Sequence, residues 1–242
     1  PADGYHLLVG GLSNFALNMG LYKQPGYDPV ADFIPLRIVV SHSYTLIARK
    51  DLAANTLREL IDYARANPGK LSYGSAGIGS VFHMIGESLQ LATGVQLTHV
   101  PYTGVGPALI DIMGGRVSSM SVNYLSAKPQ IEGNTLRAVA ISSKKRSIYA
   151  PDIPTFDEAG VPGYQFYTWN GLMAPAATPR AIIDKIFAAS MKALAMPDVR
   201  EQYVAAGVEM RSSTSPEAFA KFIVAEQQKM RNIAAAGGLK PE

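Results

Sequence analysis

Residues 72–80 read Ser72-Tyr73-Gly74-Ser75-Ala76-Gly77-Ile78-Gly79-Ser80 and join a predicted strand to a predicted helix. Glycines allow the backbone to turn tightly and expose N–H groups. The free N–H groups and the positive dipole at the start of the helix favour an anion, and Ser75 and Ser80 add hydroxyl donors. A plain glycine-rich turn capped by a serine explains the same residues equally well, because such loops are common in α/β folds.

Two motifs that also use glycine-rich loops do not fit this stretch. A nucleotide-binding P-loop has a lysine after its last glycine, whereas Ser80 follows Gly79 here. The Gly-x-Ser-x-Gly nucleophile elbow is not matched around Ser75. Anion binding and a structural turn therefore remain as the two interpretations.

Similar junctions follow two other predicted strands. One is His99-Val100-Pro101-Tyr102-Thr103-Gly104-Val105-Gly106, and the other is Gly10-Gly11-Leu12-Ser13-Asn14. Ligands of open α/β sheets bind outside the carboxyl ends of the strands. Convergence of the three junctions on one cleft is therefore a stronger indication of a ligand site than any single junction.

The rest of the chain alternates β-rich runs with helical patterns. Strands are predicted at Tyr5–Val9, Leu36–Val40, Tyr44–Arg49, Leu71–Gly74, Leu97–Val100, Val117–Val122, Leu136–Ser142 and Tyr164–Met173. Helices are predicted at Thr56–Ala66, Ser80–Thr93, Gly106–Met113, Pro179–Ala195, Pro197–Ala206 and Pro216–Ala235. Thr56 and Glu59 have the spacing of a capping box at a helix start. The alternation predicts an α/β fold built from parallel βαβ units.

Two crossings between domains give the most economical arrangement. The chain is predicted to leave a first lobe near Tyr44 and to return to it near Tyr164. Lobe 1 then comprises residues 1–44 and 165–242, and lobe 2 comprises residues 45–164. Crossings of this kind form a hinge beside a cleft. Trp169 lies on the second crossing, where it either packs in the hinge or forms a wall of the cleft.

Composition excludes several classes of function. Of 242 residues, 48% are hydrophobic and 17% charged, which is typical of a chain with real cores. A net charge of +3 is too small to indicate a nucleic-acid surface. The chain has no cysteine, which rules out disulfides and thiolate chemistry. No apolar stretch is long enough for a membrane helix, and the first residues, Pro1-Ala2-Asp3-Gly4, are expected to form a turn rather than part of a signal peptide.

No metal, cofactor or catalytic group is predicted. His83 and Glu87 have the spacing of a shared helical metal site but lack a further ligand, so His83 is expected to pack or hydrogen-bond near its helix start. His99 lies in an apolar strand and is expected to be a satisfied core residue. No paired carboxylates and no Ser/His/Asp grouping have a recognisable local pattern.

Several motifs together resemble the Bug-type receptors of tripartite tricarboxylate transporters. They cover the whole chain in the family's order: Pro1-Ala2-Asp3-Gly4-Tyr5, Leu21-Tyr22, Tyr27-Asp28-Pro29, Asn67-Pro68-Gly69-Lys70-Leu71, His99-Val100-Pro101-Tyr102, Asp111-Ile112-Met113-Gly114-Gly115, Ala159-Gly160-Val161-Pro162-Gly163-Tyr164 and Trp169-Asn170-Gly171-Leu172-Met173-Ala174-Pro175. The combination is specific, although each motif alone is weak.

The resemblance implies a periplasmic solute-binding protein with the two-lobed type II, or Venus-flytrap, fold. Such a protein delivers a small carboxylic acid to membrane transporter subunits, does no chemistry and uses no cofactor. The positions that match the family's ligand contacts, together with Trp169 as a cleft wall, are Ser13, Asn14, Phe15, Ser75, Gly77, Gly79, Ser80, Tyr102, Thr103, Gly104 and Asn123.

The chain departs from the family at three places. Val122 stands where the family often has an aspartate, and Asn14 and Phe15 stand near the positions where the family often has a threonine–histidine pair. An aromatic ring at Phe15 would suit an aromatic or bulky acid. The family also begins with a βαβα segment before the motif at Pro1, and this sequence has none. We expect a protein lacking that segment to bind weakly and to expose a sheet edge, whereas the full-length form is expected to be a monomer.

Two alternatives remain open from the sequence. One is a cytoplasmic ligand-sensing effector domain with the same fold, although no DNA-binding module is visible. The other is a small α/β hydrolase or isomerase that uses the glycine-rich loop as an oxyanion site. The second alternative requires a nucleophile and a base within reach of that loop.

Overall fold

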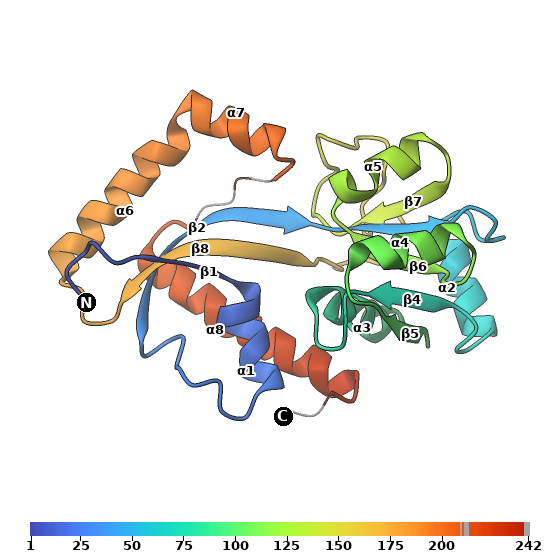
Figure 1. Cartoon of the computed structure of the whole chain (residues 1–242), viewed down its shortest axis with the longest axis horizontal. Coiled ribbons are helices and arrows are strands. Elements are labelled where there is room, and N and C mark those ends of the chain that lie inside the picture. Colours follow the sequence, from blue (N-terminus) through green and yellow to red (C-terminus); the bar gives the residue numbers. More distant parts are fainter. Residues whose placement is uncertain (209, 211–212, 240–242) are drawn as a thin grey trace. The chain divides into compact units, whose positions relative to one another are not determined.

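Two separate β-sheets organise the chain, and each belongs to its own unit (Figure 1). The computed structural model describes residues 1–208, 210 and 213–239. Unit 1 comprises Pro1–His42 and Thr168–Glu242, and unit 2 comprises Ser43–Tyr167. Unit 1 is therefore built from two stretches of sequence, with unit 2 inserted between them.

The sheet of unit 1 has three strands in the order β1-β8-β2. They are β1 (Leu8–Gly11), β8 (Tyr167–Pro175) and β2 (Phe33–Ser43). β1 runs antiparallel to β8, so that Leu8 lies opposite Met173. The helical elements are a π-helical turn η1 (Ser13–Leu17), α1 (Asn18–Leu21), α6 (Arg180–Ala195), α7 (Pro197–Ala205) and α8 (Pro216–Ala236).

Aromatic packing forms the core of unit 1. Trp169 of β8 makes edge contacts with Phe219 and Phe222 of α8, with ring centroids 5.4 and 5.5 Å apart. α8 also packs against η1 and α1. The buried amide of Gln227 in α8 donates a hydrogen bond of 2.9 Å to the carbonyl of Phe15. The long C-terminal helix thereby fixes the segment that follows β1.

The sheet of unit 2 has five strands in the order β5-β4-β6-β3-β7. These strands are β3 (Thr45–Arg49), β4 (Ser72–Ser75), β5 (Thr98–Pro101), β6 (Ser119–Val122) and β7 (Leu136–Ile141). The helices are α2 (Leu57–Ala66), α3 (Val81–Thr93), α4 (Val105–Met113) and α5 (Tyr124–Glu132). Apolar residues of β3, α4 and β6 form a buried cluster that includes Ile47, Ile112 and Met120.

Strand direction in unit 2 differs in part from the sequence prediction. β4 is parallel to both β5 and β6, as βαβ units require. β3 is antiparallel to both β6 and β7. The sheet is therefore mixed: the predicted parallel units are present at β4, β5 and β6, and β3 adds antiparallel pairs that the sequence did not indicate. Hydrophobic patterning shows that a strand is buried but carries no information on its direction.

Two further differences have local causes. The first strand was predicted at Tyr5–Val9, but β1 occupies Leu8–Gly11, because those residues pair with β8. Helix α5 was not predicted. It contains Pro129, and Ala127 is its single buried residue, so the sequence lacks the periodic apolar face of a typical helix.

Candidate functional site in unit 2

Three parallel strands of unit 2 end at the same edge of its sheet. Ser75 ends β4, Pro101 ends β5 and Val122 ends β6. The N–H of Tyr102 donates a hydrogen bond of 3.0 Å to the carbonyl of Ser75, which joins the first two strand ends directly. The predicted residues of these loops are thus brought together at the carboxyl edge, where α/β folds place ligands.

The loop at residues 75–80, which we call the glycine loop, is tightly folded. Gly77 and Gly79 have φ angles of +121° and +72°, which side-chain-bearing residues rarely adopt. Ser75 is fully buried, and its Oγ accepts a hydrogen bond of 3.1 Å from the N–H of Gly77. Ser80 caps α3 by accepting a hydrogen bond of 3.3 Å from the N–H of His83. Both serines therefore shape the loop, as the structural-turn interpretation predicted.

The same loop leaves backbone donors without partners. In the described part of the chain, the N–H groups of Ala76 and Ile78 make no hydrogen bond. Val81 and Phe82 occupy the first two positions of α3, where an N–H has no acceptor within the helix. Ser80 accepts through its oxygen, so its O–H proton remains able to donate. Unpaired donors at the positive end of a helix form a suitable environment for an anion.

The second loop, Tyr102 to Gly104, contributes less than its residue types suggested. The hydroxyl of Tyr102 donates a hydrogen bond of 2.7 Å to Asp111 of α4, and Asp111 also accepts from Arg116 at 2.8 Å. Burial, aided by the bond to Asp111, raises the pKa of Tyr102 to about 12. Thr103 is exposed. Tyr102 therefore braces the loop, and Thr103 is the side chain that is free to meet a ligand.

The third loop begins with Asn123, which caps α5. Its Oδ1 accepts a hydrogen bond of 3.1 Å from the N–H of Leu125. The amide group of Asn123 is half-buried and has no other partner among the described residues. Val122, the residue before it, is fully buried in the core cluster of unit 2.

The remaining predicted site residues belong to unit 1. Ser13 and Asn14 are exposed at the start of η1. Phe15 is 1% exposed and packs edge-on against Phe33, with ring centroids 5.5 Å apart. The expectation that Phe15 offers its ring to an aromatic acid has no support from this placement, because the ring fills the core. Trp169 is equally buried, and its indole Nε1 has no hydrogen-bond partner among the described residues.

Two histidines beside the glycine loop were not among the predicted site residues. His83 of α3 and His99 of β5 stack with ring centroids 3.8 Å apart and planes 7° apart. Nδ1 of His83 accepts a hydrogen bond of 3.1 Å from the N–H of Gly79, and Nε2 of His99 lies 2.6 Å from Ser75 Oγ. The sequence predicted that both side chains are satisfied, which is correct. The sequence gave no sign that the two rings are in contact, because His83 and His99 come together only when α3 packs against β5.

The serine–histidine contact bears on the hydrolase alternative. Ser75 Oγ lies 2.6 Å from His99, yet Ser75 is fully buried and is hydrogen-bonded to Gly77. A nucleophile must reach its substrate, so this pair is structural. His83 and Glu87 approach to 3.6 Å. In the described part of the chain, no group of metal-ligating side chains is large enough to hold a metal ion.

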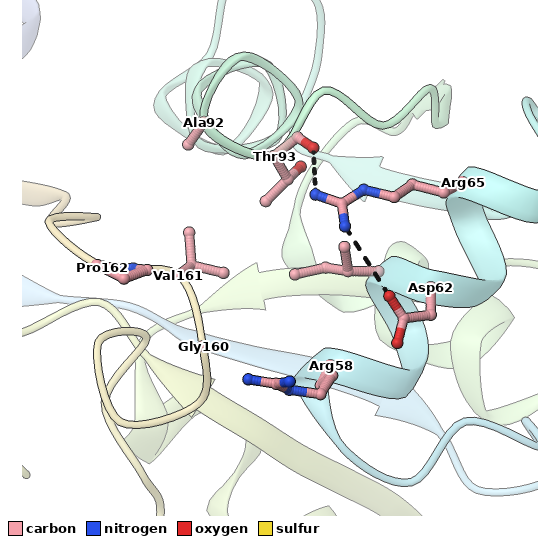
Figure 2. Close-up of a pocket in the computed structure, with 9 residues that line it drawn as sticks. Arg58, Asp62, Arg65, Ala92, Thr93, Gly160, Val161 and Pro162 are labelled. Carbon is pink, nitrogen blue, oxygen red and sulfur yellow. Dashed lines mark hydrogen bonds and ion pairs between the residues drawn. The ribbon is translucent and has the colours of Figure 1, made fainter.

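A separate groove lies between α2, the end of α3 and the loop at residues 160–162 (Figure 2). Its volume is about 360 Å³. Figure 2 shows Arg58 pointing toward the Gly160 loop, while Arg65 donates a hydrogen bond of 3.0 Å to the carbonyl of Thr93. Residues 92–93 lie at the far end of α3 from the glycine loop. The groove is therefore distinct from the carboxyl-edge site.

Comparison with known proteins supports a receptor. Residues 1–239 match the family model described as the tripartite tricarboxylate transporter family receptor. R. palustris Rpa4515 with adipate is 33% identical, with 100% of this chain and 81% of that chain covered and a TM-score of 0.81. The periplasmic binding protein BugD is 34% identical, with the same coverage and a TM-score of 0.77. MatC from Rhodopseudomonas palustris with bound malate is 31% identical, with 96% and 80% covered and a TM-score of 0.74.

The family model and the solved relatives show a solute-binding receptor, not an enzyme, with the two-lobed α/β fold of periplasmic binding proteins. The chain belongs to the receptor family of the tripartite tricarboxylate transporters, and the Bug-type resemblance is confirmed. Within the described residues, no helix is both long enough and apolar enough to cross a membrane.

Proposed function

We propose that this receptor binds a small carboxylate at the carboxyl edge of β4, β5 and β6. The proposal rests on the unpaired amides of Ala76 and Ile78, which lie beside the start of α3. Hydrogen bonds from such amides to a carboxylate are charge-assisted, and the helix end adds a favourable potential. The Ser80 hydroxyl supplies a further donor. No lysine or arginine lies in residues 75–80, so the donors of the glycine loop itself are neutral groups.

Two relatives that were solved with named ligands support a dicarboxylate. Rpa4515 was solved with adipate and MatC with malate, and each is more than 30% identical to this chain. We infer that a dicarboxylate places one carboxylate on the glycine loop. Ser13 and Asn14 of unit 1 remain predicted contacts, because they are exposed polar groups after a strand end. Thr103 and Asn123 complete the predicted set in unit 2.

The same proposal covers partners and location. A receptor of this family is expected to pass its ligand to membrane subunits of a transporter, and BugD is named as a periplasmic protein. We infer a periplasmic location and, for the full-length receptor, a monomer. Closure of the predicted lobes, residues 1–44 with 165–242 and residues 45–164, would bury the ligand and produce the form that the transporter recognises.

Substitution of Ser80 tests the site without removing the helix cap. Asp and Asn both cap helices as well as Ser does, so Ser80→Asp and Ser80→Asn should both fold. The aspartate places a negative charge beside the bound carboxylate, and we expect at least about a tenfold loss of affinity. The neutral asparagine should keep most of the affinity.

The measurement is isothermal titration calorimetry with adipate and malate, preceded by a thermal-shift screen of mono-, di- and aromatic carboxylates. A bound acid raises the melting temperature by mass action. Equal adipate affinities for Ser80→Asp and the unmodified protein would exclude the glycine loop as the carboxylate site.

A further inference from the structure

Two histidines hold the glycine loop at its two ends. At the first end, His99 Nε2 lies 2.6 Å from Ser75 Oγ. Toward the second end, Nδ1 of His83 accepts a hydrogen bond of 3.1 Å from the N–H of Gly79. The two rings stack face to face with centroids 3.8 Å apart. A single stacked pair, with one ring from a helix and one from a strand, thus contacts both ends of the loop.

The stack packs against Tyr73 and Glu87, which also belong to unit 2. The Tyr73 ring stacks on His99 with centroids 4.9 Å apart, and its hydroxyl donates a hydrogen bond of 2.5 Å to Glu87. Glu87 also accepts from Gln90 at 2.9 Å and lies 3.6 Å from His83 Nε2. His83 is only 4% exposed. The rings therefore have little freedom to move relative to the loop.

We propose that His83 and His99 are positioning residues of the carboxylate site, and that they fix the glycine loop so that the Ala76 and Ile78 amides stay unpaired and available. This inference rests on the proposed function of the loop. Neither histidine needs to contact the ligand. His99 acts through the Ser75 hydroxyl, and His83 acts through the Gly79 N–H. A loop that is ordered before binding loses less conformational entropy when the ligand binds.

These two hydrogen bonds show which ring nitrogen of each histidine a substitution must replace. His83 must have an unprotonated Nδ1, because that atom accepts the Gly79 N–H. A proton on His99 Nε2 lets it donate to Ser75 Oγ, while the Ser75 hydroxyl donates to the Gly77 carbonyl at 3.0 Å. Asparagine places its amide near the position of Nδ1, and glutamine places its amide near that of Nε2. Asparagine can therefore replace the hydrogen bond of His83, and glutamine can replace that of His99. The opposite choice at either position leaves the hydrogen bond unmade.

The experiment compares four variants of the full chain. His83→Asn and His99→Gln keep the bond at the matching atom, whereas His83→Gln and His99→Asn do not. We expect the matched variants to bind adipate within about threefold of the unmodified protein and the mismatched ones to bind about tenfold more weakly. A tenfold change corresponds to about 1.4 kcal/mol, which is near the upper end of what one hydrogen bond contributes.

A second readout does not depend on any ligand. Hydrogen exchange of the Gly79 amide, followed by NMR, should accelerate in His83→Gln and stay slow in His83→Asn. If matched and mismatched variants give the same exchange rates and affinities, the positioning role is excluded. If the exchange pattern holds but no carboxylate binds any form, the histidines still position the loop, and the proposed ligand is wrong.

Discussion

At Gly86 the backbone of α3 touches the Tyr73 ring that supports the histidine pair. A Cβ built on Gly86 would lie 2.1 Å from Tyr73 Cε2, which is far closer than atoms can approach. Gly86→Ala must displace the ring, and overpacking of this kind typically costs about 1–3 kcal/mol. The better helix propensity of alanine, about 1 kcal/mol, offsets only part of that cost.

Urea unfolding of Gly86→Ala should therefore show a lower free energy of unfolding. Gly106→Ala in α4 is the matched control, because a Cβ at Gly106 meets no atom within 4 Å. That variant should be neutral or slightly more stable. Equal changes in the free energy of unfolding for Gly86→Ala and Gly106→Ala would contradict a steric conflict between residue 86 and the Tyr73 ring.

Among the elements, those with a complete local signal were predicted correctly. Helix α2 begins with the expected capping box, in which the N–H of Glu59 donates to Thr56 Oγ1 at 3.2 Å. The direction of β3 and the existence of α5 were missed, because neither strand direction nor a proline-containing helix has a periodic pattern. The glycine loop was located from its residues alone. The histidine pair was not, since residues 83 and 99 meet only when α3 packs on β5.

Strand β5 carries a pH-dependent contribution to stability through His99. Burial, and then the neighbouring His83, lower the pKa of His99 from its usual 6.5 to about 4. The unfolded chain therefore takes up this proton at a higher pH than the folded chain does. Between pH 6.5 and pH 4 the unfolded state binds more protons, so the free energy of unfolding falls as the pH is lowered.

Urea unfolding at several pH values within that window checks this expectation. His99→Gln should show a shallower loss of stability on acidification than the unmodified chain. His6→Gln is the control, because His6 is exposed near Asp3. An unchanged pH slope in His99→Gln would mean that His99 does not resist protonation in the fold.

For the molecule as a whole, the edge of the unit 1 sheet decides how the 242-residue chain behaves in solution. Within the described residues, β1 pairs with β8 on one side, and nothing pairs with its other side. Leu8 and Val9 are 40% and 65% exposed on this strand. An exposed apolar edge strand can add a strand from another molecule.

We therefore expect this chain to associate as its concentration rises, and Val9→Lys to suppress the association, because an edge lysine is costly to bury. Size-exclusion chromatography with light scattering measures this, with Val204→Lys, 50% exposed on α7, as the matched control. A chain that stays monomeric at every concentration, or a Val204→Lys variant that dissociates as readily as Val9→Lys, would show that β1 is not the associating surface.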